Sequence, residues 1–82
     1  MPRYHFHSAD GARERDCDGT MLPDDAAART EAVRFAGEVL RDAPDGLWDR
    51  GQWRVEVTDD EDALLFTVIT LAVDAPRARR NA

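Results

Sequence analysis

The segment Gln52–Thr58 constrains the fold of this chain most strongly, because its polar and apolar residues alternate without a break. Trp53, Val55 and Val57 would lie on one side of an extended strand, and the polar residues between them would lie on the other. Alternation with a period of two is typical of a strand that buries one face. We therefore expect a β-sheet with one covered face and one polar face.

The length and charge of the chain narrow the class of protein. At 82 residues the chain has room for one domain, and its net charge is −6. A domain of this size buries only about 60% of its unfolded surface, so self-association would add to its stability. An acidic surface repels phosphate groups, and we therefore expect no nucleic acid partner.

The cysteine content and the apolar segments indicate the cellular compartment of the protein. Cys17 is the only cysteine, so no intramolecular disulfide can form, and its neighbours Asp16 and Asp18 disfavour a reactive thiolate. The apolar run at residues 63–73 is too short to cross a bilayer, and the first seven residues lack the apolar stretch of a signal peptide. We expect a cytoplasmic protein with no membrane association.

Three further segments have the pattern of strands. Residues 3–8 alternate, residues 12–18 would return as a short polar edge strand after a turn at 9–12, and residues 63–71 form the last strand. That last strand is apolar on both faces, with Leu64, Phe66 and Val68 on one and Leu65, Ile69 and Leu71 on the other. A strand of this kind is expected to be covered on both faces.

A helix is predicted between the two pairs of strands. It spans residues 24–43, with Asp24 as the N-cap and with Pro44 and Gly46 ending it. Phe35 falls on its polar side. The apolar stripe consists of Ala26, Val33, Ala36, Gly37 and Leu40, with Ala32 and Val39 at one margin.

These elements define a two-layer α+β domain of order β-β-α-β-β, with a four-stranded, mainly antiparallel sheet and one helix on one face. The domain spans residues 1–73, and residues 74–82 are predicted to be a disordered polar tail. The residues expected to be buried together are Tyr4, Phe6, Val33, Leu40, Trp53, Val55 and Val57.

Three motifs resemble an uncharacterised bacterial family of short stand-alone proteins, classed as a domain of unknown function. They are M-P-R-Y-x-F-H at the start, D-G-T-x-L-P-D-x-x-A-A-R-x-E-A at residues 18–32 and W-R-x-E-V-T-D at residues 53–59. The resemblance covers about residues 1–71 and implies no activity. The chain departs from the family pattern in its four acids at 59–62, where a glycine is usual, and Leu47 and Trp48 fall in a variable region.

A second resemblance, in topology and local composition only, is to antitoxins of the HicB type. These are also small and begin with strands. They then place a helix rich in alanine and acidic residues after a loop that resembles residues 19–22.

Two sets of residues could hold a metal, and each has a simpler interpretation. His5 and His7 lie two apart on one strand face, but the sequence identifies no third ligand, so we interpret them as part of a polar or interface surface. Residues 14–25 mimic a calcium loop with Asp16, Asp18 and Gly19, but Pro23 lies inside it and no helix enters it. We expect a solvated hairpin there and a solvated acidic turn at 59–62, with no metal or cofactor.

No group of residues indicates an enzyme. The hydroxyl residues lie in no nucleophile motif, and there is no glycine-rich phosphate loop. Arg77, Arg79 and Arg80 are interpreted as a solubilising terminus, with nucleic acid contact as the alternative.

The sequence therefore favours a non-catalytic protein-interaction module that forms a symmetric homodimer. Its predicted interaction residues are Leu65, Ile69, Leu71, Phe35 and Trp48. Alternatively, the loop at residues 44–51 covers the second apolar row of the last strand. The second class of function is an antitoxin-like regulator that binds a partner toxin.

Overall fold

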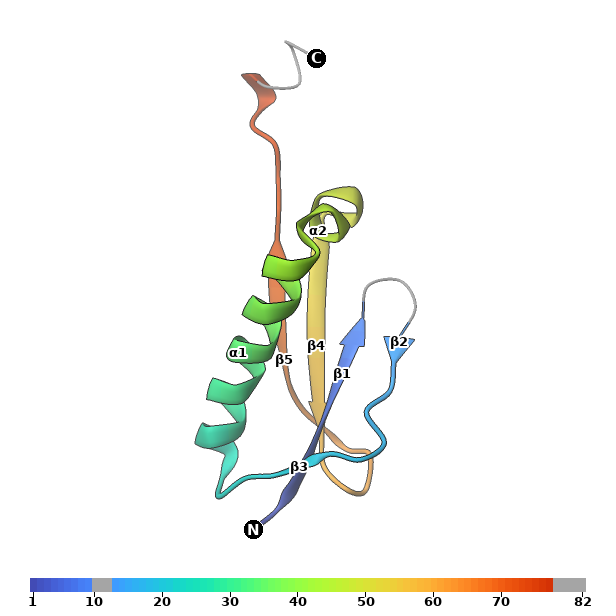
Figure 1. Cartoon of the computed structure of the whole chain (residues 1–82), viewed down its shortest axis with the longest axis vertical. Helices are drawn as coiled ribbons and strands as arrows, with labels where there is room; N and C mark the ends of the chain where they lie inside the picture. The colour runs from blue at the N-terminus through green and yellow to red at the C-terminus, as the bar shows by residue number, and fades with distance from the viewer. Residues whose placement is uncertain (10–12, 78–82) are drawn as a thin grey trace.

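The computed structural model describes residues 1–9 and 13–77, and these form an antiparallel sheet with helices on one side (Figure 1). The elements are β1 (Arg3–Ala9), β2 (Arg13–Glu14), β3 (Thr20–Met21), α1 (Asp25–Asp42), α2 (Pro44–Arg50), β4 (Gln52–Thr58) and β5 (Leu64–Leu71). The strands follow the order β2-β1-β4-β5, and β3 also pairs with β1. The predicted α+β class with a four-stranded antiparallel sheet is confirmed. Residues 10–12 of the predicted turn and 78–82 of the predicted tail lie outside the described residues.

The registers of the strands place each side chain on one of two faces. Phe6 lies opposite Val57, and Val55 opposite Val68, so these side chains share the face toward the helices. Arg54 lies opposite Ile69 on the other face, which we call the back face. The alternation at Gln52–Thr58 therefore divides the sheet as its sequence predicts.

The second strand is interrupted, where the sequence predicted one strand at residues 12–18. Both β2 and β3 pair with the same edge of β1, through Ser8↔Glu14 and Tyr4↔Thr20. Between these pairs β1 advances four residues (8 to 4) while the returning chain advances six (14 to 20), so two residues bulge out. Gly19 permits the bulge, because its φ of 73° is left-handed and a Cβ there would lie 2.8 Å from Arg3 Cγ.

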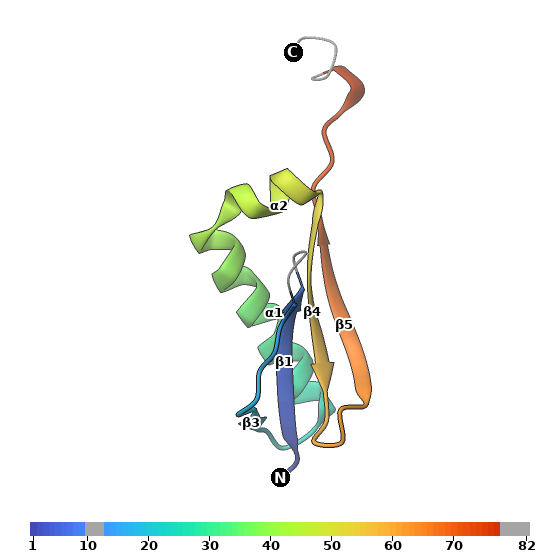
Figure 2. The same ribbon diagram turned by 90° about the vertical axis from the view of Figure 1, so that its right-hand side faces the viewer.

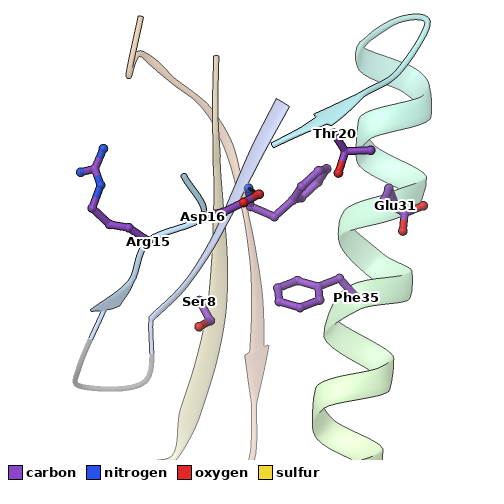
Figure 3. Close-up of a pocket in the computed structure, with 7 residues that line it drawn as sticks. Ser8, Arg15, Asp16, Thr20, Glu31 and Phe35 are labelled. Atoms are coloured by element: carbon purple, nitrogen blue, oxygen red, sulfur yellow. Dashed lines mark hydrogen bonds between the residues drawn. The ribbon is translucent and has the colours of Figure 1, made fainter. Parts of the chain in front are cut away.

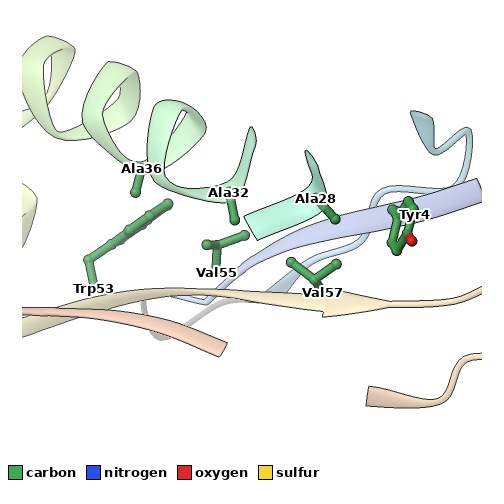
Figure 4. Packing of buried hydrophobic residues seen from close by; sticks show 7 residues of the cluster. All are labelled: Tyr4, Ala28, Ala32, Ala36, Trp53, Val55 and Val57. Carbon is green, nitrogen blue, oxygen red and sulfur yellow. The ribbon is translucent and has the colours of Figure 1, made fainter. Parts of the chain in front are cut away.

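The core lies between α1 and the sheet (Figure 4). Its fully buried residues are Tyr4, Ala28, Ala32, Ala36, Trp53, Val55 and Val57. The large side chains come from the strands and the small ones from the helix, so that the backbone of α1 comes close to the sheet. Burial of an aromatic or branched side chain contributes about 1.5–3 kcal/mol, so Trp53 and the two valines supply much of the stabilising free energy.

The predicted buried face of α1 is correct at Ala36 and Leu40, which lie in or against the core, but is rotated elsewhere. Val33, placed at the centre of the stripe, is 60% exposed, whereas Ala32, placed at the margin, is fully buried. Phe35, placed on the polar side, packs edge-on against Trp53 with ring centroids 6.0 Å apart. The hydropathy pattern favours burial of Val33 because valine is more apolar than alanine. The sheet already fills the core with bulky side chains, however, so only alanines fit where α1 lies closest to the sheet.

The segment after α1 was predicted to be a loop and is instead a second helix. α1 begins at the predicted cap, where Asp24 Oδ1 accepts the Ala27 N–H at 2.9 Å. Pro44 then opens α2 at its first turn, and Gly51 closes it with a left-handed φ of 81°. Seven residues are too few for apolar periodicity to reveal a helix.

The buried face of α1 can be tested with two adjacent substitutions. Ala32→Asp should prevent folding, because it places a carboxylate where the native side chain is 0% exposed. An unpaired buried charge costs about 3–5 kcal/mol, which approaches the total stability of a small domain. Val33→Asp should change the free energy of unfolding by less than about 0.5 kcal/mol. Equal losses in urea unfolding, followed by circular dichroism, would contradict this placement of the helix.

Candidate functional site

Three of the predicted interaction residues lie together on the back face of β5. Leu65, Ile69 and Leu71 are 39%, 54% and 66% exposed. Figure 2 shows α1 and α2 on the same side of the sheet, away from this row. The alternative that residues 44–51 cover the row is therefore wrong, since these residues form α2 on the helix side.

The other two predicted residues have different surroundings. Trp48 is 57% exposed on α2, and with Leu71 and Val73 it lines an open depression of about 430 Å³ at one end of the sheet. Phe35 is partly buried against the core and lies on the helix side of the sheet. The structure thus brings Trp48 close to the β5 row and separates Phe35 from it.

The outer edge of β5 has little protection against pairing with another strand, apart from a bulge near Leu65, where Val57 pairs with Phe66 but Thr58 pairs with Leu64. From Leu64 to Leu71 the strand contains neither a charged residue nor a proline. It ends the strand order, so within residues 1–9 and 13–77 no strand pairs with its outer edge. Natural sheets usually protect such an edge with charges, prolines or bulges.

The opposite edge of the sheet is closed by the carboxylate of Asp16. Its Oδ2 accepts the N–H of Phe6 at 3.1 Å, and its Oδ1 accepts the N–H of Gly19 at 3.0 Å. Partial burial alone would raise the pKa of this carboxyl. The backbone N–H groups of Gly19, Phe6 and Asp18 instead hold it below its ordinary value, with a further contribution from His5. Asp16 was predicted only as a residue of a solvated hairpin, although its spacing from Gly19 is a turn signal.

His5 joins this edge to the β4–β5 turn. Its Nδ1 donates to the carbonyl oxygen of Asp16 at 2.9 Å, and its Nε2 lies 2.9 Å from Asp60 Oδ1. Because both partners are acceptors, they favour the protonated ring. The hydrogen bond to Asp60, followed by the one to Asp16, raises the pKa of His5 above its ordinary 6.5.

His7 is buried, in contrast to the exposed histidine predicted from the sequence. It is 1% exposed, its Nδ1 accepts the N–H of Asp16 at 3.0 Å, and its Nε2 donates to Thr58 Oγ1 at 2.8 Å. The two imidazole rings lie parallel with centroids 6.3 Å apart. Both nitrogens of each ring contact protein groups, so the pair serves the packing of the back face.

The acidic segments are tied into the fold. Asp59 Oδ1 accepts the N–H groups of Glu61 and Ala63, and Asp62 pairs with Arg15 at 3.2 Å. The turn at 59–62 was predicted as a solvated acidic turn. Its own carboxylates order it through these hydrogen bonds and this ion pair. In the part of the chain that the structure describes, no three His, Cys, Asp or Glu side chains are grouped to hold a metal ion.

At the other end of the pseudo-calcium loop, Asp25 accepts a hydrogen bond from the Tyr4 hydroxyl at 2.7 Å. That bond is the main cause that raises the pKa of Tyr4 to about 12. The carboxylate of Asp25 therefore links the start of α1 to β1.

A cleft of about 340 Å³ lies between β1 and α1, beside the interrupted second strand. Figure 3 shows Phe35 projecting from α1 toward β1, with Asp16 on the strand side. The residues that line it are Phe6, Ser8, Arg15, Asp16, Thr20, Glu31 and Phe35. Asp16 already accepts two backbone N–H groups and Arg15 pairs with Asp62, so these charged groups serve the fold.

With the fold and surfaces described, the chain can be compared with known proteins. The model of a domain of unknown function, DUF6894, matches residues 3–72, and the chain belongs to this family. The resemblance to a domain of unknown function is thereby confirmed. Neither the curated proteins nor the solved structures include a match to this chain. Among the described residues, no helix has both the length and the apolar character needed to cross a membrane.

The role of Asp16 can be tested by truncation. Asp16→Ala leaves the N–H groups of Phe6 and Gly19 without their acceptor, and we expect a loss of about 2–4 kcal/mol in the free energy of unfolding. Asp18→Ala removes an exposed carboxylate nearby and should cost less than about 0.5 kcal/mol. Urea unfolding of both variants provides the measurement, and a small loss for Asp16→Ala would show that water replaces the carboxylate.

The raised pKa of His5 predicts a specific dependence of stability on pH. Because the folded state favours protonated His5, this stabilisation is fully present below pH 6.5 and is lost as the pH rises through the higher folded-state pKa. Asp60→Asn removes the largest cause of the shift and should flatten this part of the curve. Free energies of unfolding of the wild type and of Asp60→Asn, measured from about pH 5.5 to 8.5, test this prediction. Identical slopes for the variant and the wild type would exclude His5 as the titrating group.

Proposed function

We propose that this protein is a small bacterial, cytoplasmic protein-interaction module without catalytic chemistry, and that it forms a symmetric homodimer through β5. The observation that carries the proposal is the exposed row of Leu65, Ile69 and Leu71 on a sheet face that neither α1 nor α2 covers. Trp48 extends this surface beside Leu71.

The size of the domain supports association. Three of its seven fully buried hydrophobic residues are alanines, so the core buries little apolar surface. Contiguous apolar residues are rarely left in water by a monomer, whereas single ones such as Val33 are common and need no partner. Placing the row against its own copy around a twofold axis covers both rows at once.

The charges on the back face are compatible with such a contact. Arg54, which lies opposite Ile69, has its Nε 3.8 Å from the Glu56 carboxylate. The middle of the face therefore carries charges of both signs, and the β5 row itself carries none. Two copies with a net charge of −6 each can then meet without placing like charges at the contact.

An antitoxin-like regulator remains the second candidate class, and it differs in its partner. It requires a different protein, a toxin, to cover the exposed surface, whereas the homodimer requires only this chain. The behaviour of the purified protein on its own therefore distinguishes the two.

Self-association can be measured by size-exclusion chromatography with light scattering at tens of micromolar protein. The wild type should be a dimer, and Ile69→Asp should be a monomer, because it places a carboxylate in the row of each copy. Val33→Asp is the matched control, since Val33 is about as exposed (60%) as Ile69 (54%) but lies on α1. Val33→Asp should remain dimeric.

A monomeric wild type that retains its fold by circular dichroism would contradict the homodimer. A dimer that Ile69→Asp leaves intact, with Val33→Asp disrupting it, would place the interface on α1 instead.

A further inference from the structure

We infer that two copies of this chain pair edge to edge through β5, in antiparallel orientation, so that one continuous sheet runs through the dimer. This inference rests on the proposed self-association and specifies how the partner is bound. In this edge-paired dimer, main-chain hydrogen bonds of β5 form the contact. In a dimer whose two back faces stack, side chains would form it.

The contrast between the two sheet edges is the first argument. On the β1 edge, β2 and β3 are two residues long each, and the Asp16 carboxylate takes the N–H of Phe6 between them. On the β5 edge, eight residues form a strand with no charge and no proline, and its pairing is regular from Phe66 to Leu71, with a bulge at Leu65. An edge of that length and composition is a template for another strand.

The pairing with β4 determines which main-chain groups of β5 face outward. Ala72 donates its N–H to the carbonyl of Gly51 at 3.0 Å, and this pair continues the register Gln52↔Leu71. In an antiparallel pair, successive residues direct their N–H and C=O groups alternately to the two sides. The groups of Thr70 and Val68 therefore bond β4, and the outward groups belong to Thr67, Ile69 and Leu71. At Leu65 the bulge interrupts this alternation.

A second copy of the strand can bond the outward groups of its regular part. With the twofold axis at Val68, Thr67 of each copy lies opposite Ile69 of the other, and Leu71 lies opposite the bulged Leu65. Each pair of Thr67 and Ile69 exchanges its N–H and C=O groups across the new junction. The strand is thus complementary to itself in antiparallel orientation, which identifies the second copy as the occupant of the edge.

The same register also brings the two apolar rows side by side. Residues directly opposite each other share one face of a sheet, so Leu65, Ile69 and Leu71 from the two copies meet on the back face. The helices lie on the other side of the sheet, where they leave this contact free (Figure 2). A single arrangement therefore pairs the open edge and lets the two exposed rows shield each other where they meet.

Two matched substitutions test the edge. Thr67→Pro removes an outward N–H and leaves the bonds to β4 in place, so the variant should keep its fold and become a monomer. Thr70→Pro removes an N–H that bonds β4, so it should lose the folded state itself. Light scattering measures the oligomeric state of each variant, and circular dichroism measures whether it is folded. A folded Thr67→Pro variant that dimerises as the wild type does would overturn the inference.

Amide hydrogen exchange of the wild type, measured by NMR, tests the inference without relying on any proline variant. In the wild-type dimer the amides of Thr67, Ile69 and Leu71 should exchange at least about tenfold more slowly than in monomeric Ile69→Asp. A dimer in which these amides exchange as fast as in the monomer would overturn edge pairing and leave the proposed homodimer intact. A monomeric wild type would overturn both.

Discussion

A single helical layer covers a sheet that has two faces, and most features of this protein follow from that constraint. On the covered face, Trp53 and the neighbouring valines meet the alanines of α1 at close range. On the back face the described residues add no second layer, and the two sides of this face differ. At the β1 side, polar segments fold over the strand and bury His7. At the β5 side, apolar residues stay exposed.

The polar segments form a network that joins three parts of the chain. The bulged segment around Asp16 is linked to β1 through Phe6 and His7, and His5 connects it to Asp60 in the β4–β5 turn. Arg15 and Asp62 add a second, exposed link between the same segments. Main-chain groups contribute to most of these bonds. The main effect of the network is therefore to hold the backbone of residues 15–19 in place. The low pKa of Asp16 and the high pKa of His5 have a structural explanation here and need no catalytic one.

The sequence predicted the parts of the fold whose signals are local. Strict alternation located β4, and Asp24 marked the start of α1 within one residue. The rotation of α1 was not predictable in the same way, because it depends on which side chains the sheet supplies: an alanine face fits against Trp53, and Val33 does not. The role of Asp16 depends on a bond to Phe6, ten residues away, and no local pattern records that contact. The exposed row on β5 was predicted because its residues alternate along one strand, whereas the place of Trp48 beside it required the unpredicted α2.

The bulge of two residues between β2 and β3 has a consequence for the stoichiometry of assembly. A sheet with one open edge closes on itself after two copies, since the second copy uses the edge that the first one offered. A sheet with two open edges has no such limit and can add copies at both ends. Shortening the segment at 15–19 by two residues would let the returning strand run straight along β1 and would remove the carboxylate that blocks it. In the proposed dimer, the bulge would thus keep assembly at a closed pair, whereas a straight second strand would offer another open edge for growth into a fibre.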